Sequence, residues 1–146
     1  MKKQSEEYLT KTIGLAGAAL DRAKETCAIY EEFLGWEIED IFVSEYLDGE
    51  TRIYESLWIF AGELLGEAKA FITDQNYDII RLKTSIEYVN FISKDFFMSG
   101  EQSNNESRLT VVFISQRMTS STLKASRSNC IYLRNILRDR LLPNVA

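Results

Sequence analysis

The stretch that decides the fold runs from residue 37 to residue 60 and reads EIEDIFVSEYL, then DGE, then TRIYESLWIF. Both flanking runs are rich in Ile, Val, Phe, Tyr and Trp, the residue types that favour β-strands. Asp48-Gly49 lies between them, and an Asp-Gly pair is a strong signal for a tight hairpin turn. The sequence therefore predicts two antiparallel strands that begin a sheet.

Strand-like runs continue from the hairpin towards the C-terminus, at residues 64–72, 79–82, 85–91, 109–116 and 122–125. The pattern then changes to a helical period over residues 127–142, with apolar positions at Cys130, Leu133, Ile136, Leu137 and Leu141. We therefore expect an antiparallel β-barrel or strongly bent sheet over residues 36–126, capped by a C-terminal helix. With 146 residues and one proline, the chain is predicted to be a single α+β domain, residues 1–146.

A long N-terminal helix is predicted over residues 5–34, with Gly35 as its stop signal. Its apolar and small residues form a heptad-like seam with alternating steps of four and three: Leu9, Ile13, Ala16, Leu20, Ala23, Cys27, Tyr30 and Leu34. At 1.5 Å per residue, about 30 residues span roughly 45 Å, which exceeds the width of such a domain. The helix must therefore bend over its own domain, pair with a second copy or another protein, or break near Gly14 or Gly17 and fold back.

The chain contains no histidine. This excludes histidine acid–base chemistry, Ser-His and Cys-His nucleophiles, and imidazole metal ligands. Residues 74–78 have the D-x-N-x-D spacing that opens a calcium loop, but Ile79 and Ser85 stand where a glycine and a glutamate are required. We expect no catalytic residues, no metal and no cofactor, although acid–base work by carboxylate pairs such as Glu63 and Glu67 stays open.

The sequence carries no sign of export. No stretch approaches the ~20 apolar residues of a membrane span. Met1-Lys2-Lys3 is not followed by the apolar run of a secretory signal, so we expect a cytoplasmic protein. Its two cysteines, Cys27 and Cys130, belong to no C-x-x-C pair and fall on apolar helix faces. We expect both to be reduced and buried.

Charge is unevenly distributed along the chain. Between Glu31 and Glu67 there are eleven acidic residues and one base, Arg52, which gives a local charge of −10. Solvated outer faces of strands explain such a run, and so does an acidic surface that attracts a basic protein partner. The candidates for that surface are Glu37, Glu39, Asp48 and Glu50. The overall charge of −5 argues against nucleic-acid binding.

Two parts of the chain resemble a known family, the bacterial pleckstrin-homology-like (PH-like) barrel domains. Residues 78–91 resemble the mid-barrel strands, and residues 109–114 followed by 122–127 and a helix resemble the ending. The resemblance covers roughly residues 36–143 and implies a barrel plugged by its last helix, with the N-terminal helix as an addition. Members bind phosphoinositides or peptides, or serve as scaffolds. Lipid-binding members carry basic residues at the first hairpin loop, where this chain has Asp48-Gly49-Glu50, so we expect no phosphoinositide binding.

Three functions follow from these observations, in order of preference. The first is a non-catalytic interaction module or scaffold that binds protein and self-associates through its N-terminal helix, with Leu9, Ile13, Ala16, Leu20 and Ala23 as the contact residues. The second is a small-ligand or lipid carrier that uses the barrel interior. The third and most remote is a carboxylate-dependent enzyme.

Overall fold

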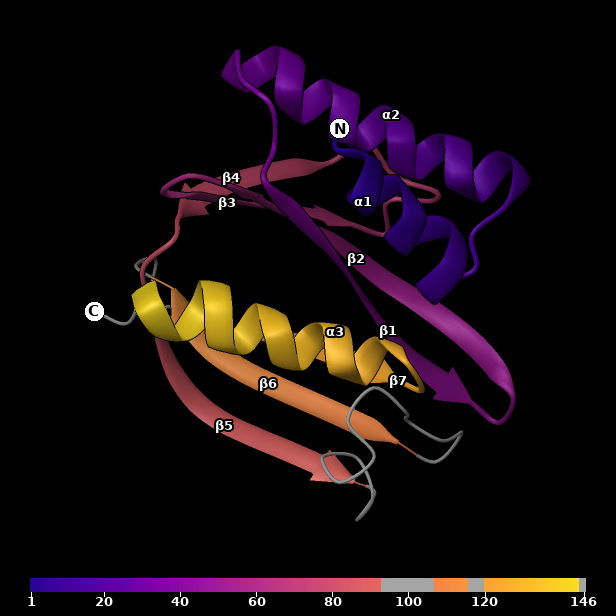
Figure 1. The fold of residues 1–146 in the computed structure, drawn as a ribbon, viewed down its shortest axis with the longest axis vertical. Helices are drawn as coiled ribbons and strands as arrows, with labels where there is room; N and C mark the ends of the chain where they lie inside the picture. The colour runs from indigo at the N-terminus through magenta and orange to yellow at the C-terminus, as the bar shows by residue number, and fades with distance from the viewer. Residues whose placement is uncertain (93–106, 116–119, 145–146) are drawn as a thin grey trace.

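The computed structural model describes residues 1–92, 107–115 and 120–144, which form an α+β fold with two antiparallel sheets (Figure 1). The first sheet has the order β1-β2-β3-β4, formed by β1 (Asp40–Asp48), β2 (Thr51–Ala61), β3 (Leu64–Lys69) and β4 (Tyr77–Arg81). The second has the order β5-β6-β7, formed by β5 (Thr84–Ile92), β6 (Arg108–Ser115) and β7 (Ser120–Ser126). No strand pairing joins the two sheets within the described residues, so a closed barrel, one of the two expected forms, is not what the chain builds.

The predicted hairpin is confirmed. β1 and β2 pair antiparallel from Asp40 opposite Phe60 to Asp48 opposite Thr51. Gly49 has a φ of 64°, a left-handed conformation that glycine adopts without steric cost. The turn therefore fixes the register that sends the apolar residues of both strands into the core.

The continuous helix predicted for residues 5–34 is wrong. The chain forms α1 (Lys3–Glu7) and a π-helical turn (Tyr8–Thr12), breaks, and resumes as α2 (Gly17–Leu34). Gly14 and Gly17 have φ values of 79° and 57°, while Ala16 is extended. Left-handed glycines end a right-handed helix, so the chain reverses here and folds back, the third of the expected possibilities.

The fold-back turns the heptad-like seam inward. Leu9, Ile13 and Ala23 are almost completely buried within the chain, Leu20 is half-buried, and Ala16 is exposed in the break. In Figure 1, α2 lies across the first sheet above β3 and β4. A stripe that covers its own sheet cannot also serve as a dimer seam, so this chain does not offer the predicted self-association surface.

The core fills the space between the two sheets and the C-terminal helix. Its largest fully buried side chains include Trp58, Phe42, Phe60, Phe71 and Phe113. The predicted final helix is present as α3 (Asn129–Ile136), which continues through a π-helical turn (Leu137–Leu141) and a 3₁₀ turn (Leu142–Asn144). Its predicted apolar face is confirmed, apart from a half-buried Leu137. None of the helices in the described part of the chain combines the length and hydrophobicity needed to cross a bilayer.

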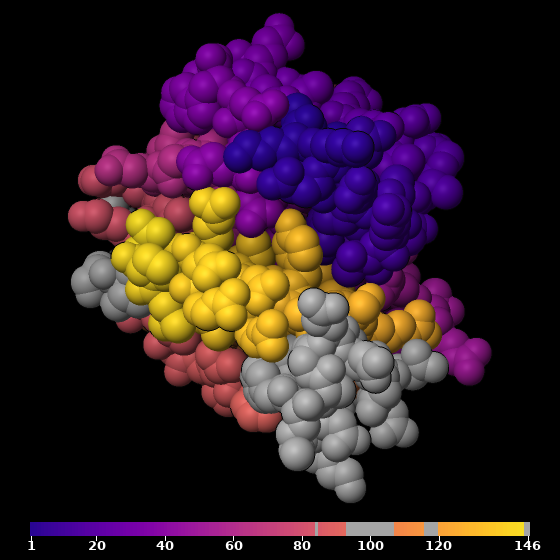
Figure 2. Space-filling model, viewed as in Figure 1, coloured from indigo at the N-terminus to yellow at the C-terminus, as the bar shows by residue number. Residues whose placement is uncertain are grey.

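The C-terminal helix also packs beside the N-terminal segment, as the neighbouring yellow and indigo surfaces of Figure 2 show. The rings of Tyr8 and Tyr132 stack there with centroids 3.8 Å apart. Both cysteines are free and buried, as expected for Cys27 and Cys130. Burial raises the pKa of each thiol to about 12, which keeps both protonated and unreactive at neutral pH.

A buried carboxylate, Glu45, ties the two sheets together. The register of β1 shifts between Ser44 and Glu45, and Glu45 is fully buried. It accepts hydrogen bonds from the Ser126 backbone N–H at 2.8 Å, from the Ser126 hydroxyl, and from Asn129 Nδ2 at 3.2 Å. Its Oε1 lies 3.1 Å from Nε of Arg52. We call Glu45, Arg52, Ser126 and Asn129 the polar junction.

The N-terminal segment is attached to this junction at two points. The Tyr8 hydroxyl donates to Asn129 Oδ1 at 2.8 Å and accepts from the Val43 N–H at 2.9 Å. The Arg52 guanidinium donates to the Ile13 carbonyl at 2.6 Å. Because buried polar groups must be paired, the junction fixes β1, β7, α3 and the N-terminal segment relative to one another.

Candidate functional site

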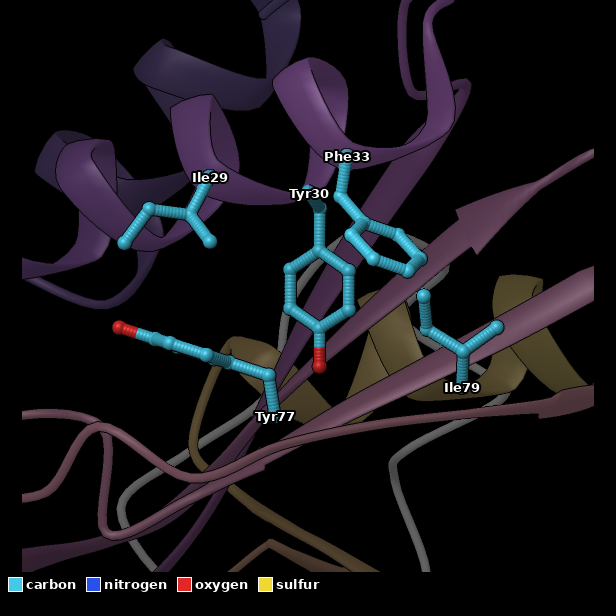
Figure 3. Close-up of a pocket in the computed structure, with 5 residues that line it drawn as sticks. All are labelled: Ile29, Tyr30, Phe33, Tyr77 and Ile79. Atoms are coloured by element: carbon cyan, nitrogen blue, oxygen red, sulfur yellow. The ribbon is translucent and has the colours of Figure 1, made fainter.

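An apolar groove lies on the surface between α2 and β4. Residues four apart on a helix share a face, so Ile29 and Phe33 project side by side from α2. Residues two apart on a strand share a face, so Tyr77 and Ile79 project together from β4. Figure 3 shows these side chains and Tyr30 converging from the two elements. They enclose a cavity of about 220 Å³.

One aromatic side chain of the groove is largely exposed. Phe33 has 78 % of its surface accessible, and Trp36, two residues past the end of α2, is 49 % exposed. Large apolar side chains gathered at a concave site are typical of an interaction surface rather than of a solvated face. We refer to Ile29, Tyr30, Phe33, Tyr77 and Ile79 as the docking groove.

Tyr30 forms the inner wall of the docking groove. Its hydroxyl donates to the Asp78 carbonyl at 3.0 Å, and its ring meets the ring of Tyr77 edge-on at 5.7 Å. The ring lies directly on Gly66 of β3, where a Cβ would be 2.6 Å from Cε1 of Tyr30. The glycine thus makes room for the tyrosine, and α2 can approach the sheet closely at this point.

The pKa of Tyr30 is raised mainly by burial. The carboxylates of Asp78 and Glu67, which project from the opposite face of the sheet, raise it further. Glu32 is exposed beside Phe33 on α2. The Tyr77 hydroxyl is buried and, within the structure as described, makes no hydrogen bond.

The structure does not assemble the predicted acidic surface. Asp48 and Glu50 are exposed around the β1–β2 turn, and Glu37 is exposed ahead of β1. Glu39 lies near the opposite end of β1, about nine residues from Asp48, which corresponds to roughly 30 Å. Glu39 also accepts a hydrogen bond from Arg140 at 3.0 Å, so it is engaged by the C-terminal helix.

A polar cleft surrounds Glu39. It has a volume of about 300 Å³ and is lined by Glu39, Asp40, Tyr132 and Arg140 among others. The Gly62 N–H and the Arg140 guanidinium hold the pKa of Glu39 below its ordinary value, while burial raises the pKa of Tyr132. A general acid or base needs a pKa near the working pH, and these shifts move both groups away from it. No cluster of three metal-ligating side chains occurs in the described ranges.

The docking groove was not predicted from the sequence. Tyr30 was expected in the heptad-like seam, and no role was predicted for Ile29, Phe33, Tyr77 or Ile79. The available signal was the i, i+4 spacing of Ile29 and Phe33, which lie off the seam on a helix whose seam is already complete. No family model, no curated protein and no solved structure matches this chain.

Proposed function

We propose that this protein is a non-catalytic interaction module whose docking groove receives an apolar side chain from a basic segment of a partner protein. The observation that carries the proposal is Phe33, which is 78 % exposed at the rim of a cavity lined by four other apolar or aromatic residues. Binding energy at protein interfaces concentrates where an anchor side chain fills such a pocket.

The size of the groove supports a single anchor. A cavity of about 150 Å³ is enough to hold a benzene-sized group. The cavity here measures about 220 Å³, so it accommodates one aromatic or branched aliphatic side chain. The remaining contact would come from the exposed face of α2.

The charge of the surroundings supports a basic partner. Glu32 is exposed on α2, Glu37 is exposed shortly after its end, and the whole chain carries a net charge of −5. A lysine or arginine that flanks the anchor gains attraction from these carboxylates and is steered towards them during approach. An acidic segment meets repulsion at the same place.

The PH-like assignment remains a proposal. It is supported by a four-stranded and a three-stranded antiparallel sheet followed by one C-terminal helix. The competing carrier function needs a hollow interior, and the interior positions are occupied by aromatic side chains such as Trp58, Phe60 and Phe113. That packing favours the interaction module over the carrier.

Phosphoinositide binding is not expected. Arg52, the base that follows the first hairpin loop in the sequence, is engaged by Glu45 and by the Ile13 carbonyl, and the turn itself carries Asp48 and Glu50. We therefore predict no co-sedimentation with vesicles that contain phosphoinositides beyond that with neutral vesicles. Salt-sensitive binding to the phosphoinositide vesicles would contradict this prediction.

The proposed function is tested by panning a random peptide library against the wild-type chain, with counter-selection on Phe33→Ser. We expect enriched peptides to share one large apolar residue flanked by Lys or Arg. Their affinity, measured by fluorescence anisotropy, should fall about tenfold or more on Phe33→Ser, since a central anchor contact is lost. Leu142→Ser is the matched control, because it removes an exposed large apolar side chain from the C-terminal 3₁₀ turn, outside the docking groove. Enrichment of acidic peptides, or equal affinity for wild type and Phe33→Ser, contradicts the proposal.

A further inference from the structure

Among the described strands, β5 lies at the edge of its sheet. It has nine residues and pairs only with β6 among the described strands, and it borders the lower side of the molecule in Figure 1. Natural proteins protect such edges with charges, prolines, bulges or very short strands. The one bulge of β5 falls between Ile86 and Tyr88. Beyond it, residues 88–92 read YVNFI, without a charge or a proline.

The side chains beyond the bulge are large, apolar and exposed. Tyr88 and Ile92 are 54 % and 56 % exposed, and Val89 and Phe91 are 40 % and 51 % exposed. Val89 and Phe91 pair with the buried residues Val111 and Leu109 of β6, so they point to the core side of the sheet. Val89 and Phe91 therefore extend the apolar layer of the core to β5. Tyr88 and Ile92 make the opposite face of this strand largely apolar as well.

We propose that β5 pairs antiparallel with the β5 of a second copy of this chain, with the twofold axis at Asn90. In this register Tyr88 lies opposite Ile92, Val89 lies opposite Phe91, and Asn90 meets its own copy. Each exposed aromatic ring thus faces an exposed β-branched side chain, a favourable cross-strand pair, on both faces of the sheet. The two Asn90 amides can exchange hydrogen bonds, since each has a donor and an acceptor.

The self-complementary order of these five residues is what identifies a second copy as the occupant. A twofold axis brings the same strand against itself, so the pattern must match its own reverse. The apolar–apolar–Asn–apolar–apolar order does so and opposes no like charges. Pairing would join the two three-stranded sheets into one sheet of six strands. The inference is independent of the docking groove, which lies on α2 and β4.

Engineered cysteines test the register directly. Residues directly opposite on antiparallel strands have Cα atoms about 4.5–5.5 Å apart, within reach of a disulfide. Asn90→Cys should therefore give a disulfide-linked dimer under mild oxidation at micromolar concentration. Ser85→Cys is the matched control, because its two copies would lie ten residues apart, roughly 33 Å. The native cysteines are buried and do not compete.

Sedimentation velocity of the full wild-type chain tests the pairing itself. We expect a concentration-dependent dimer in the micromolar range, and an increase of about tenfold or more in the dissociation constant for Tyr88→Lys, which puts an ammonium group opposite Ile92 on both sides. If Tyr88→Lys does not fold, the comparison of the two cysteine variants decides. A wild type that stays monomeric at tens of micromolar, or equal cross-linking of Asn90→Cys and Ser85→Cys, overturns the proposal.

Discussion

Replacing Glu45 with alanine is expected to lower the free energy of unfolding by about 3–5 kcal/mol, the cost of removing one partner from a buried ion pair. The substitution leaves the Arg52 guanidinium without its carboxylate in the interior. It also removes the acceptor of the Ser126 N–H and one of the two acceptors of Asn129 Nδ2, the other being the Val43 carbonyl. Because a domain of this kind has a total stability of only about 5–15 kcal/mol, the loss is a large fraction of the whole.

Urea unfolding followed by tryptophan fluorescence measures this effect, since Trp58 is buried in the core and becomes exposed on unfolding. The matched control is Glu63→Ala, which removes an exposed carboxylate at the β2–β3 turn and should change stability by less than about 0.5 kcal/mol. A Glu45→Ala variant as stable as Glu63→Ala would mean that the polar junction does not hold the sheets together.

Gly66→Ala is expected to destabilise the protein by about 1–3 kcal/mol, the usual cost of forcing an extra methyl group into a packed site. The new Cβ would lie 2.6 Å from Cε1 and 2.9 Å from Cζ of Tyr30. The tyrosine cannot withdraw freely, because its hydroxyl is bonded to the Asp78 carbonyl and α2 is anchored by the buried Ala23 and Cys27. The same displacement should weaken binding in the docking groove.

A double-mutant cycle with Tyr30→Leu separates this contact from general effects of alanine in a strand. If the tyrosine ring is the obstacle, Gly66→Ala should cost little in the Tyr30→Leu background, and the two changes should be strongly non-additive. If the two losses in the free energy of unfolding are additive, the strain does not arise between the new methyl group and Tyr30, and Gly66 is not required to accommodate the tyrosine ring.

Local patterns were sufficient for the β1–β2 hairpin and for the C-terminal helix. Asp48-Gly49 specifies a tight turn by itself. The apolar face of residues 130–141 can be buried only by packing against the sheet. The N-terminal helix could not be settled in the same way, because a seam with steps of four and three looks the same whether it faces a partner or its own sheet. The helix breaks at Gly14 and Gly17, whose left-handed backbone conformation allows the chain to fold back.

The polar junction and the docking groove depend on contacts between distant parts of the chain. In the sequence, Glu45 cannot be distinguished from the exposed acids of the neighbouring strands. It is buried beside a shift in the register of β1, and its partner Ser126 lies 81 residues away in the chain. The groove requires that α2 cross β4, a relation that no local spacing specifies. The acidic residues between Glu31 and Glu67 do not form one surface for a related reason. Successive residues of a strand point to opposite faces of the sheet, and acids at the two ends of a strand are separated by its length.

The most direct test of the central claim is a ¹⁵N–¹H correlation titration of the wild-type chain with a peptide selected by panning. The account predicts that the shifted amides cluster at Ile29, Phe33, Tyr77 and Ile79, and that the same titration of Phe33→Ser leaves them in place. Shifts that cluster elsewhere, or that persist unchanged in Phe33→Ser, would show that the groove between α2 and β4 is not the docking site.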